Sequence, residues 1–179
     1  IRDAILDFKK SGKFVYAYGE YYYETTYYLA SVADKVYLNP EGEILFNGLS
    51  ANVTFFKNAL EKMGVEVQVI RHGKFKGAVE PFILDKLSTE NRKQIDEYLH
   101  SIMSNLTVKI GNTRKLSPQR VDEIATKWLV RTNENAVEYG LVDKLSYKDE
   151  VLEDIKNKLG LKGKKTKDMK ADGAINGRS

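Results

Sequence analysis

Cysteine is absent from this chain of 179 residues, and only two histidines and three prolines occur. Without a thiol the chain can form no disulfide bond, no thiolate nucleophile and no zinc site with cysteine ligands. The histidines are His72 and His100. Because His100 falls inside a helical pattern, where a surface position is its ordinary role, a histidine-based catalytic triad is not expected.

Sequence motifs that mark common enzymes and membrane spans are missing as well. The chain has no G-x-x-x-x-G-K-[ST] phosphate loop, no G-x-G-x-x-G turn, no H-E-x-x-H helix and no G-x-S-x-G nucleophile elbow. No apolar run approaches the roughly 20 residues that a transmembrane helix needs. Any catalytic group must therefore be sought outside these motifs.

The net charge of +4 is concentrated at one end of the chain. Of the 29 basic and 25 acidic residues, six basic and two acidic ones lie within positions 162–179. The rest of the chain therefore carries equal numbers of both signs, and it offers no overall basic surface for DNA or RNA. We expect no nucleic-acid partner.

Helix and strand patterns alternate along the first 70 residues. The spacing of apolar residues predicts helices over about 1–10, 24–33 and 52–63. Runs of aromatic and β-branched residues predict strands over 13–18, 34–39, 43–48 and 65–70. Such alternation is typical of an α/β fold with a mainly parallel sheet flanked by helices.

The second part of the chain is predicted to be helical. A long helix with a continuous apolar stripe begins after Ser88, and another begins after Ser117 with Pro118 at its first position. Two shorter helices are expected over about 133–140 and 147–159. The predicted domain covers residues 1–161 and has a helical C-terminal part.

The two ends of the chain differ from this domain. The chain opens on "IRDAILDF", without methionine and already inside an amphipathic pattern, so we expect it to be a piece of a longer protein. Residues 162–179 are rich in lysine and poor in large apolar residues. This composition predicts a flexible basic linker towards another domain.

The stretch "RHGKFKGAVEPF" at residues 71–82 places four basic side chains between a predicted strand and an apolar run. A lysine can act as a general base when burial or cationic neighbours lower its pKa by several units. Lys74 and Lys76 lie between Gly73 and Gly77, and the spacing does not decide which of them turns inward. The alternative is an ordinary solvated loop.

A tyrosine-rich run, "YAYGEYYYETTYYLA" at residues 16–30, also has two interpretations. Tyr21, Tyr22 and Tyr23 could line a substrate groove or a subunit interface, because tyrosine combines a large contact area with a polar tip. Tyr27 and Tyr28 fit better as packed residues of a helix.

Three stretches carry a family resemblance: "YYLASVADKVYLNPEG", "KMGVEVQVIRHGKFKGAVEPF" and "NAVEYGLVDKL", in this order. They resemble the signal peptide peptidase A family, also called protease IV, and the likeness covers the chain up to its tail. The chain is most similar to the N-terminal half of a long form with two tandem homologous halves. The resemblance implies a Clp protease/crotonase-like fold, and it makes residues 162–179 the linker towards a missing C-terminal half.

For function, the resemblance implies a serine-lysine dyad endopeptidase that degrades released signal peptides without a cofactor or metal. It implies a homo-oligomer at the bacterial cytoplasmic membrane, attached through a segment absent from this chain. The catalytic part would face the periplasm or the cell exterior. Signal peptides and the chain's own C-terminal half are the implied partners.

The resemblance also assigns residues. The general base falls on Lys76, which an "AVEPF" segment follows closely, whereas Lys74 corresponds to a variable position. Glu24 stands where the serine-bearing half has its nucleophile, and a carboxylate would not normally attack a peptide bond. Thr25 and Thr26 replace two glycines there, and threonine lacks the backbone freedom of glycine.

Leu49, after Gly48, likewise takes the place of a further serine. This half would therefore supply the base and the missing half the nucleophile, so the isolated chain is expected to hydrolyse nothing.

Two other function classes stay open. The first is a non-catalytic assembly domain of the same fold, which Glu24 and the two threonines favour. The second is an acyl-CoA enzyme of the related crotonase branch, which is disfavoured because the glycines expected near Glu24 are absent.

Overall fold

The computed structural model of this protein describes residues 1–69 and 77–161. The helices are α1 (Arg2–Lys10), α2 (Glu24–Ala30), α3 (Lys57–Lys62), α4 (Glu80–Ile83), α5 (Thr89–Arg114), α6 (Pro118–Thr126), α7 (Asn133–Glu138) and α8 (Lys148–Lys158), with a 3-10 turn η1 (Gly77–Val79). The strands are β1 (Tyr16–Tyr23), β2 (Lys35–Leu45) and β3 (Lys144–Leu145). Lys74, Lys76 and the predicted linker at 162–179 lie outside the described residues.

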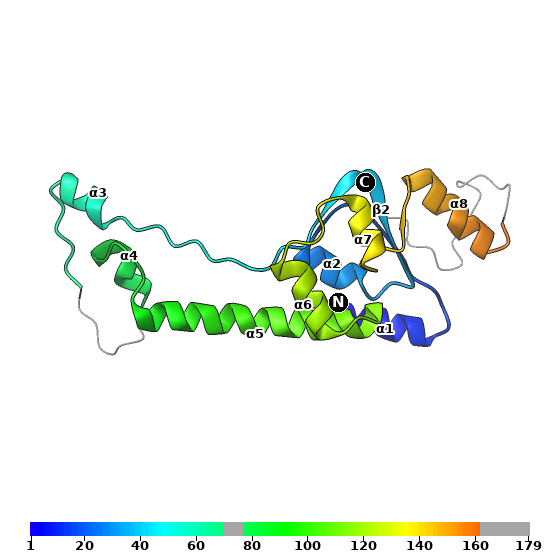
Figure 1. The fold of residues 1–179 in the computed structure, drawn as a ribbon, viewed down its shortest axis with the longest axis horizontal. Helices are drawn as coiled ribbons and strands as arrows, with labels where there is room; N and C mark the ends of the chain where they lie inside the picture. The colour runs from blue at the N-terminus through cyan, green and yellow to red at the C-terminus, as the bar shows by residue number, and fades with distance from the viewer. Residues whose placement is uncertain (70–76, 162–179) are drawn as a thin grey trace.

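The molecule is elongated, with a body at one end and an arm at the other (Figure 1). Helix α5 runs from the body to the end of the arm, and its 26 residues span about 39 Å at about 1.5 Å per residue. Helices α3 and α4 lie near the start of α5, far from the sheet. Within the described ranges, no helix combines the length and apolar character that a bilayer crossing requires.

The sheet of the body is parallel and has the strand order β1-β2-β3. Gly19 pairs with Leu38, and the pairing resumes with Tyr21 opposite Glu43, so residues 39–42 of β2 bulge out opposite Glu20. A Cβ atom on Gly42 would lie 2.0 Å from the carbonyl oxygen of Glu20, so the bulge requires glycine. The two strands predicted over 34–39 and 43–48 are therefore one bulged strand.

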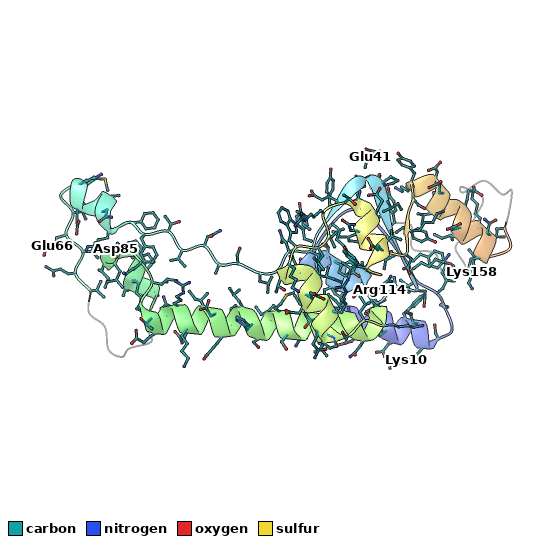
Figure 2. The ribbon with its side chains drawn as sticks, viewed as in Figure 1. Lys10, Glu41, Glu66, Asp85, Arg114 and Lys158 are labelled. Atoms are coloured by element: carbon teal, nitrogen blue, oxygen red, sulfur yellow. The ribbon has the colours of Figure 1, made fainter. Side chains whose placement is uncertain are left out.

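One further strand prediction was wrong, and one strand was not predicted. The stretch predicted as a strand over 65–70 forms none in its described part, residues 65–69. Glu66 lies at the far end of the arm (Figure 2), and the strands with which it would have to pair lie in the body. Conversely, β3 was not predicted, because a strand of only two residues is too short to show the alternating pattern by which strands are recognised in a sequence.

The hydrophobic core lies in the body, where the helices cover the sheet. Among the described residues, those of the core and those packed against it all lie outside positions 50–101. Tyr27 is fully buried and donates a hydrogen bond to the carbonyl oxygen of Leu141 at 2.6 Å. Tyr28 packs against the core, so the packing role predicted for these two tyrosines is confirmed.

The tyrosines of β1 alternate between core and solvent, as the pleat of a strand requires. Tyr22 is 5% exposed and belongs to the core, so of the two interpretations left open for it the packed one holds. Tyr21 and Tyr23 are 59% and 53% exposed. Their role at a groove or interface stays a prediction.

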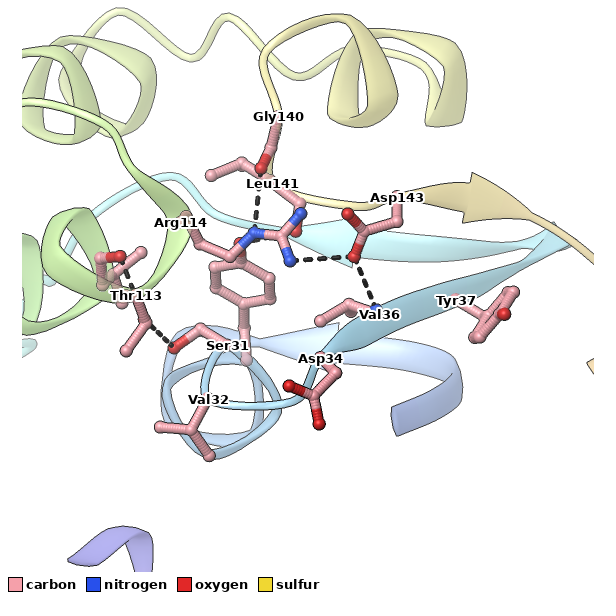
Figure 3. A network of polar contacts seen from close by, with 12 residues as sticks. Ser31, Val32, Asp34, Val36, Tyr37, Thr113, Arg114, Gly140, Leu141 and Asp143 are labelled. Atoms are coloured by element: carbon pink, nitrogen blue, oxygen red, sulfur yellow. Dashed lines mark hydrogen bonds and ion pairs between the residues drawn. The ribbon is translucent and has the colours of Figure 1, made fainter. Parts of the chain in front are cut away.

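Arg114, the last residue of α5, ties the long helix to the sheet (Figure 3). Its Nε donates to the carbonyl oxygen of Gly140 at 3.0 Å, and its Nη1 pairs with Oδ2 of Asp143 at 2.8 Å. The same Asp143 oxygen accepts the backbone N–H of Val36 in β2 at 2.7 Å. Burial alone would raise the pKa of Asp143, but the hydrogen bonds from Arg114 and Val36 outweigh it and hold the pKa below its ordinary 3.8.

Replacing Arg114 by methionine should destabilise the body, because its side chain is only 8% exposed, the Gly140 carbonyl oxygen would lose this donor and Asp143 would lose its cationic partner. We expect the free energy of unfolding to fall by about 2 kcal/mol. Urea denaturation of the purified chain measures this change.

The matched control is Arg92→Met on the same helix, whose side chain is 76% exposed. This control should change the unfolding free energy by less than about 0.5 kcal/mol. Equal effects of the two substitutions would contradict the role assigned to Arg114.

Candidate functional site

A buried polar network lies at the tip of the arm and is centred on Glu80, which is 1% exposed. Its carboxylate accepts hydrogen bonds from the backbone N–H of Ser88 at 3.0 Å, from the Ser88 hydroxyl and from Nδ2 of Asn91 at 3.1 Å. The Ser88 Oγ in turn accepts the backbone N–H of Asn91 at 3.1 Å, which confirms Ser88 as the N-cap of α5. We call Gly77, Glu80, Ser88 and Asn91 the Glu80 network.

Gly77 belongs to this network through its close approach to Asn91. A Cβ atom on Gly77 would lie 2.2 Å from Nδ2 and 2.3 Å from Cγ of Asn91, closer than carbon atoms can come. Only glycine therefore fits at this position while the Asn91 amide is held by Glu80. Gly77 directly follows Lys76 in the sequence, and Lys76 itself lies outside the described residues.

The tip is also held on its other side. The ring of Phe56 stacks on that of Phe82 with 5.9 Å between the ring centroids. In addition, the backbone N–H of Phe56 donates to the carbonyl oxygen of Pro81 at 2.7 Å. These contacts fix α4 to the segment that leads into α3.

Glu24 lies in the body, where β1 ends and α2 begins. Its Oε1 accepts the backbone N–H of Asn47 at 3.0 Å, so the carboxylate fastens the loop that follows β2. Thr26 accepts the backbone N–H of Tyr23 through its hydroxyl at 2.8 Å, which stabilises the start of α2. Glu24 stands at the position that the family resemblance gives to the nucleophile. Its side chain and that of Thr26 instead stabilise the strand-to-helix turn through hydrogen bonds.

A hollow of about 690 Å³ lies beside this turn, lined by Asn47, Gly48 and Leu49 and by parts of α5 and α6. His100, Ser104 and Asp122 all line it. However, Nδ1 of His100 lies 2.8 Å from the carbonyl oxygen of Asp96 in its own helix. The imidazole is therefore oriented by a backbone carbonyl group of α5 and not by an acidic side chain. This agrees with the helix-surface role predicted for His100.

Among the described serines, the hydroxyls of Ser11, Ser31, Ser88 and Ser117 form hydrogen bonds, whereas the buried Oγ of Ser146 has no partner. Ser31 is fully buried, and its Oγ accepts a hydrogen bond from Nη1 of Arg2 at 2.8 Å. Ser88 is held in the Glu80 network, whereas Ser50 is exposed. Among residues 1–69 and 77–161 no group of three histidine, aspartate or glutamate side chains could hold a metal ion.

Comparison with known proteins assigns the family. Residues 7–162 match peptidase family S49. The chain belongs to this family. The parallel sheet flanked by helices confirms the predicted α/β fold class and is consistent with a Clp protease/crotonase-like fold.

The curated relatives of this S49 chain are proteases by name. It is 37% identical over 121 residues to "Protease 4" of Salmonella typhi, covering 68% of this chain and 20% of that protein. It is 36% identical over 129 residues to "Protease 4" of Haemophilus influenzae, covering 72% and 21%. A third relative, "Serine protease SPPA, chloroplastic" of Arabidopsis thaliana, is 30% identical over 161 residues, covering 90% and 24%. These matches confirm the predicted family, and the chain spans about a fifth of the length of the two bacterial relatives.

In this S49 chain, the arm tip that contains Gly77 and the β1–α2 turn that holds Glu24 lie apart. Gly77 contacts Asn91 near the start of α5, whereas Leu99 is the first α5 residue to line the hollow beside Glu24. Leu99 follows Asn91 by eight positions, which is about 12 Å along the helix axis. The tip and the β1–α2 turn are therefore separate places.

Because Gly77 packs closely against Asn91, we expect the effects of substituting these two residues to be non-additive. Gly77→Ala should loosen the tip, because the new Cβ overlaps the Asn91 amide, and the backbone N–H groups of Ser88 and Asn91 should exchange with solvent about tenfold faster. Native-state hydrogen exchange measures this directly.

In the Asn91→Ala background the overlapping atoms are gone. There Gly77→Ala should change exchange at Ser88 by less than about twofold, because the two substitutions share one contact. The same acceleration in both backgrounds would contradict the packing of Gly77 on Asn91.

Proposed function

We propose that this chain is the base-bearing half of a serine endopeptidase that degrades released signal peptides. Lys76 would act as the general base, and the nucleophilic serine would come from a C-terminal half outside this chain. Membership of peptidase family S49 and the names of the relatives support a protease. The division of labour between two halves is our inference from the residues of this chain.

The observation that carries the proposal is the separation between the arm tip and the β1–α2 turn. The turn holds Glu24, which is bonded to Asn47, and offers no free hydroxyl at its first helical position. Gly77 lies in the arm that projects from the body, and the residue that precedes it in the sequence is a lysine. A base supplied by the residue next to Gly77 would therefore pair with a serine from another half or subunit and not with one at the β1–α2 turn.

The proposed reaction is acyl transfer to serine followed by hydrolysis. Neutral Lys76 takes the proton of the serine Oγ as this oxygen attacks the scissile carbonyl carbon. Backbone N–H groups of the serine-bearing half stabilise the oxyanion, and Lys76 returns the proton to the leaving amine. Water, activated by the same lysine, then cleaves the acyl-enzyme ester and releases the peptide acid.

The surface of β1 supports an extended peptide as the substrate. In the described sheet β1 is an edge strand, with Tyr21 and Tyr23 exposed on it. An extended peptide can pair with such an edge, and apolar signal-peptide residues would contact the tyrosine rings. We further propose a homo-oligomer at the bacterial cytoplasmic membrane, anchored through a segment outside this chain, with its catalytic part facing the periplasm or cell exterior.

The decisive substitution is Lys76→Ala in the full-length protein that contains this chain. Peptide hydrolysis should fall by at least about 1,000-fold, because no other group would take the serine proton. Lys86→Ala, an exposed lysine of the same arm, is the matched control and should leave the rate unchanged. Retained activity in a correctly assembled Lys76→Ala protein would make this domain a non-catalytic assembly unit.

The isolated chain should hydrolyse no peptide, because the nucleophile is absent from it. A fluorogenic signal-peptide substrate, incubated with the purified chain at high concentration, measures this. Ser50 is an exposed serine that directly follows Leu49, one of the loop residues that line the hollow. Hydrolysis that disappears in Ser50→Ala would show that the chain carries its own nucleophile.

A further inference from the structure

We infer that a slot in the body, between β2 and the segment that follows α6, binds a short extended peptide with free ends. The slot has a volume of about 450 Å³. It is lined by residues 43–45 of β2 and, on the other side, by residues that include Trp128, Arg131 and Asn133. None of these residues takes part in the proposed catalysis. We call this hollow the Trp128 slot.

Trp128 has a backbone conformation that tryptophan rarely adopts. It follows the C-cap of α6 with a φ of 48°, in the left-handed region. Its N–H donates to the carbonyl oxygen of Ala125 at 3.1 Å, and the N–H of Leu129 donates to that of Ile124 at 3.0 Å, which is the bond pattern of a Schellman motif. Glycine is the usual residue at this position, because a Cβ crowds the backbone there. A strained residue that is kept at such a position points to a use for its side chain.

The indole ring of Trp128 does little for the fold of the described residues. It is 58% exposed. Within residues 1–69 and 77–161 it stacks on no aromatic ring, lies against no cationic group and donates no hydrogen bond from Nε1. A large ring with one polar atom, exposed at the wall of a slot, is suited to contact with another molecule.

The backbone of β2 in this slot has a strand on one side only. Residues 43–45 pair with β1, whereas β3 pairs with β2 only at Tyr37 and Leu38. Residues of a strand direct their N–H and C=O groups to alternate sides, so at least one of residues 43–45 directs both groups away from β1. No described residue hydrogen-bonds to them on that side. An extended peptide supplies the missing strand.

Side-chain amides hold the wall of the slot that faces β2. Nδ2 of Asn133 donates to the carbonyl oxygens of Pro40 and Gly42, at 2.9 Å in both cases. Oδ1 of Asn135 accepts the backbone N–H of Arg131 at 3.3 Å. Because these bonds fix the wall before a ligand arrives, binding orders little of the protein.

The charges of the slot match a peptide with free ends. Glu43 and Arg131 both line it and are exposed, and neither forms an ion pair with a described side chain. The ammonium group and the carboxylate of a free peptide carry the opposite charges, so they can pair with Glu43 and Arg131 respectively. Proteolysis releases peptides of this kind, so the slot suits the products of the proposed reaction. Binding itself requires no catalysis.

Tryptophan fluorescence of the purified chain tests this directly, because Trp128 is its only tryptophan. The probe is a synthetic hexapeptide of alternating valine and alanine with free ends. We expect a saturable blue shift of the emission as the ring leaves water. Amidation of the peptide's C-terminus or acetylation of its N-terminus should each weaken binding about tenfold, and methylation of alternate backbone nitrogens should weaken it at least as much.

Two substitutions assign the ends of the peptide. Arg131→Gln should bind the free and the amidated peptide with affinities within about twofold, because the partner of the carboxylate is gone. Glu43→Gln should likewise bind the free and the acetylated peptide within about twofold. The matched control is Lys127→Gln, an exposed lysine next to Trp128 that does not line the slot. It should keep both wild-type differences.

Trp128→Gly separates binding from stability. Calorimetric titration should show at least about tenfold weaker binding of the free peptide, because the ring is lost. The midpoint of urea denaturation should stay the same or rise, because glycine adopts the left-handed conformation without strain. A lower midpoint would show that the ring serves the fold and would overturn its assignment to a ligand.

Unchanged emission up to about 1 mM peptide, or equal wild-type affinities for the free and capped peptides, would overturn the inference. A blue shift that grows with protein concentration in the absence of peptide, together with a doubled mass in sedimentation, would show that a second copy fills the slot. That result would overturn it as well. Retained hydrolysis in Lys76→Ala would overturn the proposed function alone, because peptide binding to the slot is measured without turnover.

Discussion

The buried guanidinium of Arg114 is the contact on which the shape of this protein depends, because it fixes the C-terminal end of α5 to the sheet. It binds Gly140 and Asp143, and Asp143 binds Val36 of β2 in turn. Arg2 of α1 adds a second tie, since its Nη2 donates to the carbonyl oxygen of Lys109 in α5 at 2.7 Å. These charged hydrogen bonds, together with the burial of Leu106 and Ile110 in the core, hold one end of the helix in the body while the other end projects from it.

Body and arm are stabilised by different physics. The body buries apolar side chains from α2, β2, α5, α6 and α7 around the sheet, and this burial provides most of its stability. The arm tip instead combines one aromatic pair with the hydrogen bonds of the Glu80 network. Because hydrogen bonds are directional, such a tip can be placed accurately with little apolar burial, and changes there need not disturb the body.

Helix starts were the features best predicted from sequence, because a cap acts through its immediate neighbours. Ser88 and Ser117 cap α5 and α6 as expected. The strand assignments were less accurate, since a strand exists only where another strand pairs with it, and the run at 65–69 has no such neighbour. Glu80 was overlooked as a site residue because nothing in "AVEPF" distinguishes a buried glutamate from an exposed one. Its partners become visible only when α4 is placed against the start of α5.

The sequence by itself determined the family, the α/β class, the helix caps and the absence of a serine at the β1–α2 turn, because each depends on local residue identity. The tertiary structure decided that β2 is one bulged strand, that Tyr22 faces the core while Tyr21 and Tyr23 do not, and that Glu80 is buried. It also decided that the arm tip and the turn holding Glu24 lie apart along α5. The physical reason is that pairing, burial and separation are relations between segments distant in the chain, and these relations are set by packing.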